Sequence, residues 1–198
     1  LVTLWGVRLS LYLTRRNWGR GEDPRYAEWR ANSGERFWLH SLFKVFIAQA
    51  FFMWVIALAL QYAQLSALPA AWTVWDGLGL ILWIIGFLFE AVGDAQLASF
   101  KADPENRGRV MNRGLWSCTR HPNYFGEALM WWGIFVIALA VPDAWWTAIS
   151  PLTITAVLLK ITGIPLTERL LVERRPGYVE YIRDTSSFIP WFPKKRPE

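Results

Sequence analysis

The segment Leu115-Trp-Ser-Cys-Thr-Arg-His-Pro-Asn-Tyr-Phe-Gly-Glu127 places a cation, a histidine and an amide around one proline, directly before the apolar run 128–141. The proline biases the residue before it away from the α region, and Asn123 is a favourable N-cap for a helix that starts at Tyr124. The free N–H groups of such a helix end, with Arg120 beside them, suit a phosphate or a carboxylate. The alternative is a basic interfacial turn that only anchors a transmembrane helix.

Composition predicts an all-α, polytopic transmembrane bundle. Apolar residues make up 54% of the chain, and several windows approach the ~20 apolar residues that cross a bilayer. These windows are residues 1–13, 42–60, 71–92, 128–141 and 144–166. They predict about five crossings. Because the first residue stands in the middle of an apolar pattern and is not methionine, we also expect further helices upstream.

The basic residues predict the orientation of these crossings. All 21 Lys and Arg residues fall within 8–44, 101–120 and 160–196. Under the positive-inside rule, these segments and the C-terminus face the cytoplasm. The net charge of +5 then reflects orientation and contact with anionic lipids, and we expect no nucleic-acid partner.

The C-terminal residues carry two further predictions about the membrane surface. The aromatic and proline-rich stretch 188–193 is typical of an interfacial anchor. The basic run Lys194-Lys195-Arg196 that follows it predicts a patch against lipid headgroups.

Two more groups of polar residues are candidates for a site. Glu90, Asp94 and Lys101 are spaced by 4 and 7 residues, which places them on one helical face at a depth where ionisable groups are costly. The alternative is an interfacial face with a snorkelling lysine. After the last apolar run, four residues are candidates to line the same mouth as Arg120: Glu168, Arg169, Tyr178 and Tyr181.

Cysteine and histidine usage argues against several chemistries. The single cysteine, Cys118, excludes an internal disulfide, and with only two histidines we expect no metal site. The chain also lacks a Gly-rich dinucleotide motif after a strand, so a bound nucleotide would not be held in a Rossmann manner.

Several motifs in order resemble a known family. They are Asp94-x-Gln96-x3-Phe100-Lys101, Gly114-Leu-Trp116, Thr119-Arg-His-Pro-Asn-Tyr-Phe-Gly-Glu127 and Tyr178-x2-Tyr181-x3-Thr185-x2-Phe-Ile-Pro190. Together they resemble the C-terminal family of the steroid 5α-reductases, in particular its bacterial branch of membrane proteins, DUF1295. The Arg-His-Pro-x-Tyr element alone is shared with sterol reductases and isoprenylcysteine carboxyl methyltransferases.

The resemblance implies a single transmembrane domain, 1–198, in a bacterial inner membrane, with a cavity for NADPH that is open to the cytoplasm. Residues 1–65 would form the N-terminal helices and a basic loop, and 71–198 the cofactor-binding half. The cofactor-binding residues that it implies are Asp94, Lys101, Trp116, Arg120, His121, Asn123, Tyr124, Glu127, Glu168, Arg169 and Tyr178.

The expected function is NADPH-dependent reduction of a C=C bond in a lipid or steroid-like enone, with Glu90 or Tyr124 as the catalytic acid. The expected partners are therefore membrane lipids and a small hydrophobic substrate. The chain departs from the steroid reductases because their early tyrosine falls at Trp5 and their Gln–Glu pair is missing. Two alternatives remain, an S-adenosylmethionine-dependent methyltransferase and a non-catalytic lipid- or sterol-binding membrane protein.

Overall fold

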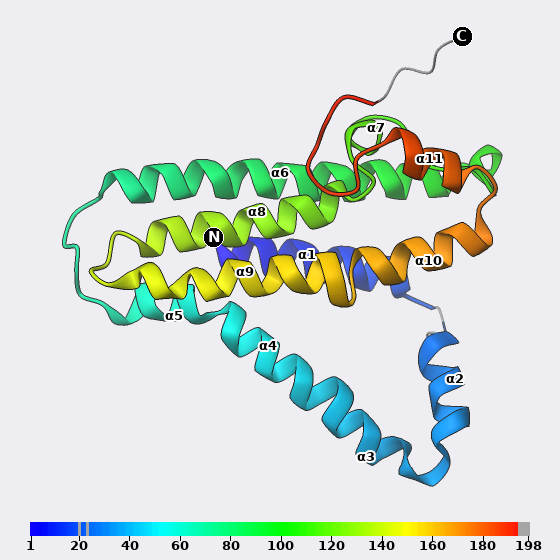
Figure 1. Cartoon of the computed structure of the whole chain (residues 1–198), viewed down its shortest axis with the longest axis horizontal. Helices are drawn as coiled ribbons and strands as arrows, with labels where there is room; N and C mark the ends of the chain where they lie inside the picture. The colour runs from blue at the N-terminus through cyan, green and yellow to red at the C-terminus, as the bar shows by residue number, and fades with distance from the viewer. Residues whose placement is uncertain (20, 23, 194–198) are drawn as a thin grey trace. The chain divides into compact units, whose positions relative to one another are not determined.

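The computed structural model describes residues 1–19, 21–22 and 24–193, and every regular element within these residues is helical (Figure 1). This confirms the prediction of an all-α protein. The predicted lipid patch at residues 194–196 lies outside the described residues. The chain forms two compact units, Leu1–Trp54 and Val55–Glu198.

The first unit contains a separate N-terminal helix and most of one long helix. The separate helix is α1, Val2–Asn17. The long helix changes its winding several times and is made of α2 (Pro24–Ser33), the 3₁₀ turn η1 (Gly34–Arg36), α3 (Phe37–Ser41), the π-helical turn η2 (Leu42–Ile47) and α4 (Ala48–Ile56). Near its start the Trp29 ring packs edge-on against Phe37, with ring centroids 5.4 Å apart, and the Arg30 guanidinium lies over the same phenyl ring.

The second unit carries all of the predicted site residues. Its elements are α5 (Leu58–Leu65), α6 (Val74–Ala102), η3 (Pro104–Asn106), α7 (Leu115–Cys118), α8 (Pro122–Ala138), η4 (Ala144–Ala148), α9 (Ile149–Ala156), η5 (Val157–Ile161), α10 (Ile164–Arg174) and α11 (Tyr178–Asp184). The longest of them, α6, begins at a capping box in which the Thr73 backbone N–H donates to Asp76 Oδ2 at 2.8 Å and Thr73 Oγ1 accepts from the Asp76 backbone N–H. This reciprocal pair satisfies N–H groups that the first helical turn leaves without partners.

Three helices among the described residues are long and apolar enough to cross a membrane: Tyr26–Ile56, Val74–Ala102 and Ala144–Arg174. They support an integral membrane protein. The predicted count of about five crossings is not confirmed. The apolar runs 1–13 and 128–141 lie in α1 and α8, which have 16 and 17 residues and are shorter than the ~20 residues that a crossing needs.

Helices α6 and α8 pack with their backbones in close approach along a line of glycines. A Cβ atom added to Gly79 would lie 2.5 Å from the carbonyl oxygen of Gly133, and one added to Gly86 would lie 2.6 Å from that of Gly126. No side chain fits at these distances. Small residues at such an interface allow the large contact area that holds helices together within a bilayer.

Helix α8 lies between α6 and α9, and α6 and α9 run in the opposite direction to it (Figure 1). Polar side chains also link neighbouring helices. Trp132 Nε1 of α8 donates to Thr155 Oγ1 of α9 at 3.3 Å, and the fully buried Ser150 hydroxyl of α9 donates to the carbonyl oxygen of Ile56. At the end of the bundle where α6 begins, the Tyr62 hydroxyl donates to the Pro142 carbonyl oxygen at 3.0 Å. The bundle therefore has an end formed by the start of α6 and the end of α8, and an opposite end formed by the end of α6 and the start of α8.

We predict that Gly86→Ala lowers the melting temperature of the detergent-purified protein, because its Cβ would meet the backbone of α8. Overpacking of this kind costs about 1–3 kcal/mol. The matched control is Gly77→Ala in the same helix, where nothing lies within 4 Å of the added Cβ. That control should be neutral or slightly stabilising, since alanine favours a helix over glycine. Equal melting temperatures for the two variants would contradict the close approach.

Candidate functional site

The turn between α7 and α8 is fixed against α6 by the residues around the proline. Pro122 takes the first helical position of α8 and His121 is the N-cap, so the prediction that Asn123 caps a helix starting at Tyr124 was wrong. The physical reason is that proline has a preset φ and no N–H, and both suit the first position of a helix. The Pro122 ring then packs on Gly93 of α6, while Trp116 Nε1 donates to the Gly93 carbonyl oxygen at 2.9 Å.

Arg120 joins this turn to the C-terminal helices. Its side chain is 8% exposed, and Nε donates to Glu168 Oε1 at 2.7 Å. Nη1 donates to the carbonyl oxygen of Ile182 at 2.8 Å and to that of Thr185. None of these hydrogen bonds uses Nη2. The guanidinium is therefore held by α10 and by residues of α11 and its C-terminal end through Nε and Nη1.

His121 and Tyr124 extend the same network. His121 Nε2 lies 3.1 Å from Glu168 Oε1, and because the carboxylate accepts, the ring carries its proton on this nitrogen. The Tyr124 ring stacks on the imidazole at a centroid distance of 5.2 Å, and its hydroxyl is hydrogen-bonded to Thr167 Oγ1 at 3.1 Å. Glu168 thus bridges Arg120 and His121, and the structure brings together four of the predicted site residues. We call Arg120, His121, Tyr124 and Glu168 the Arg120 cluster.

Two tyrosines of α11 pack beside this cluster. Tyr178 and Tyr181 are both buried, with ring centroids 5.7 Å apart. Burial raises the pKa of both phenols, and the Glu168 carboxylate raises the pKa of Tyr178 further. Both phenols therefore stay protonated at physiological pH, and the Tyr181 hydroxyl donates to the Trp116 carbonyl oxygen. Tyr181 was predicted to line the same mouth as Arg120, but it was not among the predicted cofactor-binding residues.

The remaining predicted residues lie at different depths around the cluster. Glu90 and Asp94 on α6 are 3% and 4% exposed. Glu90 packs against Gly126 of α8, where an added Cβ atom would lie 3.0 Å from the Glu90 Cβ. Asn123 Oδ1 is buried and has no hydrogen-bond partner within the described part of the chain. Glu127 is half-buried one turn further along α8.

Arg169 does not join the Arg120 cluster. Its side chain is 81% exposed, and Nε lies 3.6 Å from Glu173 Oε1 one turn along α10. Adjacent residues on a helix point about 100° apart, so α10 can direct Glu168 toward Arg120 only by directing Arg169 away from it.

A basic cleft of about 310 Å³ lies at the end of α6. Its cationic residues are Lys101, Arg107 and Arg175. The Asp103 carboxylate in its lining accepts hydrogen bonds from the Glu105 backbone N–H at 2.9 Å and from Asn106 Nδ2 at 3.0 Å, so it caps its own turn. Three cations around one space suit phosphate groups. Arg107 and Arg175 were not in the predicted set; the only signal for them is the basic composition of the two loops.

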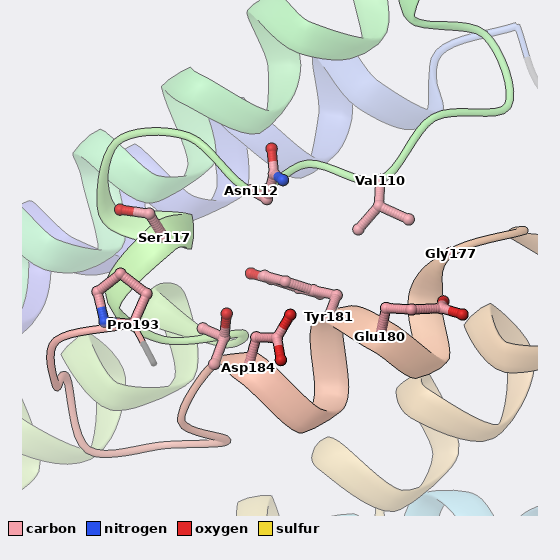
Figure 2. Close-up of a pocket in the computed structure, with 9 residues that line it drawn as sticks. Val110, Asn112, Ser117, Gly177, Glu180, Tyr181, Asp184 and Pro193 are labelled. Atoms are coloured by element: carbon pink, nitrogen blue, oxygen red, sulfur yellow. The ribbon is translucent and has the colours of Figure 1, made fainter. Parts of the chain in front are cut away.

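A second cavity, of about 400 Å³, lies beside Tyr181. Figure 2 shows side chains of α11 directed toward the segment that precedes α7. The lining residues are Val110, Asn112, Ser117, Gly177, Glu180, Tyr181, Asp184, Thr185 and Pro193. Among the described residues, the lining of this acidic cavity contains two carboxylates and no lysine or arginine, and Arg183 Nε lies 3.4 Å from the Asp184 carboxylate. The lining suits hydroxyl or cationic groups better than phosphate. Elsewhere in the described residues, no group of three or more His, Cys, Asp or Glu side chains could hold a metal ion.

Comparison with known proteins gives one curated relative and one family. The chain is 28% identical over 215 residues to an uncharacterized protein of the fission yeast Schizosaccharomyces pombe. The alignment covers 96% of this chain and 61% of the relative, so the chain spans about three fifths of the length of that protein. No solved structure matches the chain significantly. The family model described as "Protein of unknown function (DUF1295)" matches residues 1–185, and this protein therefore belongs to the DUF1295 family.

Proposed function

We propose that this protein is an integral-membrane, NADPH-dependent reductase of a C=C bond in a lipid or steroid-like enone. Family membership confirms the DUF1295 part of the resemblance, while the relation to steroid 5α-reductases stays a prediction. The observation that carries the proposal is the basic cleft of Lys101, Arg107 and Arg175. It lies at the same end of the bundle as the Arg120 cluster.

The residues present fit such a cofactor in two respects. The basic cleft offers three cations, which suits a nucleotide that carries a phosphate in addition to its pyrophosphate. The buried Asn123 Oδ1 is an acceptor for which the described residues supply no donor, and a carboxamide N–H group would supply one. When bound, the cofactor would supply the hydride, and the protein would hold and orient it.

The chain itself must supply a proton donor. Hydride addition to an enone builds negative charge on the carbonyl oxygen, so an acid or hydrogen-bond donor has to face that oxygen. Tyr124 is the better placed of the two candidates, because its ring is fixed by His121 and its hydroxyl by Thr167. Glu90 is the second candidate, and it lies 3% exposed between α6 and α8.

One observation favours a second function. The acidic cavity has the Glu180 and Asp184 carboxylates beside the Tyr181 ring, and no lysine or arginine of the described residues lines it. Such a cavity would accept the two distinguishing groups of S-adenosylmethionine, its sulfonium cation and its unphosphorylated ribose. This supports the methyltransferase alternative. The choice between the two functions rests on which cavity holds the nucleotide.

The cofactor prediction compares two neighbouring arginines. Arg175→Gln should weaken NADPH binding to the detergent-purified protein by about 1.5–3 kcal/mol, as expected when a hydrogen bond to a charged group is lost. Arg174→Gln is the matched control, because Arg174 is exposed and does not line the cleft. Titration calorimetry gives both affinities. Arg120 is a poor choice for this test because its side chain also holds α10 and α11 together.

The same titration separates the proposed functions. The reductase should bind NADPH more tightly than NADH, and Arg175→Gln should reduce that preference. Tight binding of S-adenosylmethionine without NADPH binding, weakened by Glu180→Gln and unaffected by Arg175→Gln, would establish the methyltransferase instead.

The reaction prediction concerns Tyr124. In lipid nanodiscs, Tyr124→Phe should lower NADPH oxidation with enone lipids by about 10²–10⁴-fold, the usual contribution of a general acid. Tyr62→Phe is the matched control, since the Tyr62 hydroxyl bonds to Pro142 at the other end of the bundle. Activity that survives both Tyr124→Phe and Glu90→Gln would remove these residues as acids. No turnover of any lipid despite bound NADPH would favour a binding protein.

We also propose that the basic end of the bundle faces the cytoplasm, because residues 45–100 and 121–159 contain no lysine or arginine. With Cys118 replaced by serine, single cysteines at the exposed positions Ala67 and Asp143 should react with an impermeant thiol reagent added outside intact cells. A cysteine at the exposed Glu105 should react only after the cells are opened. Labelling of position 105 in intact cells would reverse the orientation.

A further inference from the structure

The residues that follow α11 form an extended strap across the turn between α7 and α8. The Arg120 backbone N–H donates to the Ser186 carbonyl oxygen, Thr119 Oγ1 donates to that of Phe188, and the Trp191 backbone N–H donates to that of Cys118. Each of these three bonds is 2.9 Å long. We call residues 185–193 the C-terminal strap.

The two sides of the strap differ sharply in burial. On the inner side, Thr185 is 7% exposed and the Phe188 ring packs edge-on against Phe125 of α8 at a centroid distance of 5.8 Å. On the outer side, Ile189 is 65%, Trp191 70% and Phe192 84% exposed. The inner side is therefore part of the folded bundle, and the outer side presents three large apolar side chains that the described part of the chain leaves mostly exposed.

The depth of the strap follows from the contacts between α6 and the turn that the strap crosses. Helix α6 begins after Thr73, between Trp72 and Trp75, and about 20 residues of helix cross the hydrocarbon core. That length ends near Gly93. Trp116 and Pro122 both contact Gly93, so the turn that bears Cys118 lies at this boundary, and the Trp191–Cys118 bond holds the strap there.

From these observations we infer that the outer side of the C-terminal strap inserts into the headgroup region of a bilayer that contains anionic lipid. Tryptophan is favoured at this depth, where its ring is partly apolar and partly hydrated. The basic residues Lys194-Lys195-Arg196 follow directly in the sequence and would contribute attraction to anionic headgroups. This inference does not depend on the proposed reductase activity.

The strap would then connect lipid contact with the candidate site. Its backbone bonds hold Cys118, Thr119 and Arg120, and the Arg120 guanidinium also donates to the Thr185 carbonyl oxygen. Insertion of Trp191 and Phe192 would therefore keep the Arg120 cluster at the boundary of the hydrocarbon core. A hydrophobic substrate dissolved in the bilayer would meet the cluster at this depth.

The experiment places an environment-sensitive fluorophore on a cysteine at position 192 of the full chain, in a Cys118→Ser background. Phe192 is 84% exposed, so its replacement leaves the packing of the bundle unchanged. The protein is placed in nanodiscs of phosphatidylcholine, with or without phosphatidylglycerol, that contain a lipid spin-labelled near its headgroup. We expect blue-shifted emission that the spin label quenches, with more quenching when phosphatidylglycerol is present.

Two other positions calibrate the signal. A fluorophore at Ile84, which is 45% exposed midway between Val74 and Gly93 on α6, should be quenched by a spin label deep in the acyl chains. One at Glu105, on the exposed turn after α6, should be quenched by neither label. A signal at position 192 equal to that at 105 would overturn the inference and indicate a protein partner or a second copy of the chain. Equal quenching with and without phosphatidylglycerol would overturn the requirement for anionic lipid.

Discussion

The close approach of α6 and α8 is the constraint on which the rest of this protein depends. Gly79 and Gly86 face Gly133 and Gly126 without room for a Cβ atom on either helix. Inside a bilayer, packing of this kind replaces the hydrophobic effect as the source of helix association. It also fixes the height of the α8 N-terminus against Gly93 of α6, and with it the position of every residue in the turn that bears Arg120.

A buried cation then determines how the C-terminal part folds onto that turn. Arg120 is buried, and its charge is compensated by the Glu168 carboxylate and by the carbonyl oxygens of Ile182 and Thr185. Removing one partner of a buried ion pair is strongly destabilising, because it leaves a desolvated charge without compensation. The network therefore serves as structure as well as a candidate site. A ligand that contacts Arg120 would do so through Nη2, which none of these bonds uses.

The two cavities at this end of the bundle have linings of opposite charge. The basic cleft is lined by Lys101, Arg107 and Arg175, while the acidic cavity is lined by Glu180 and Asp184. Only Pro176 separates Arg175 from Gly177, which lines the acidic cavity, so the link between α10 and α11 forms part of both. A phosphate-rich nucleotide would bind in the basic cleft and a cationic one in the acidic cavity. The identity of the bound nucleotide therefore decides between the proposed reductase and the proposed methyltransferase.

The sequence by itself determined the all-helical class, the membrane character and the grouping of Arg120, His121 and Tyr124, because apolar runs and adjacent residues carry that information locally. Its prediction of about five crossings is confirmed only as far as three long apolar helices among the described residues, because an apolar run does not state how far its helix extends. Tertiary structure alone decided that Arg120 pairs with Glu168, 48 positions away, and that the neighbouring Arg169 faces solvent. The physical reason is rotational: the residue types along α10 left its orientation about its own axis undetermined, and packing against α8 and α11 fixed it.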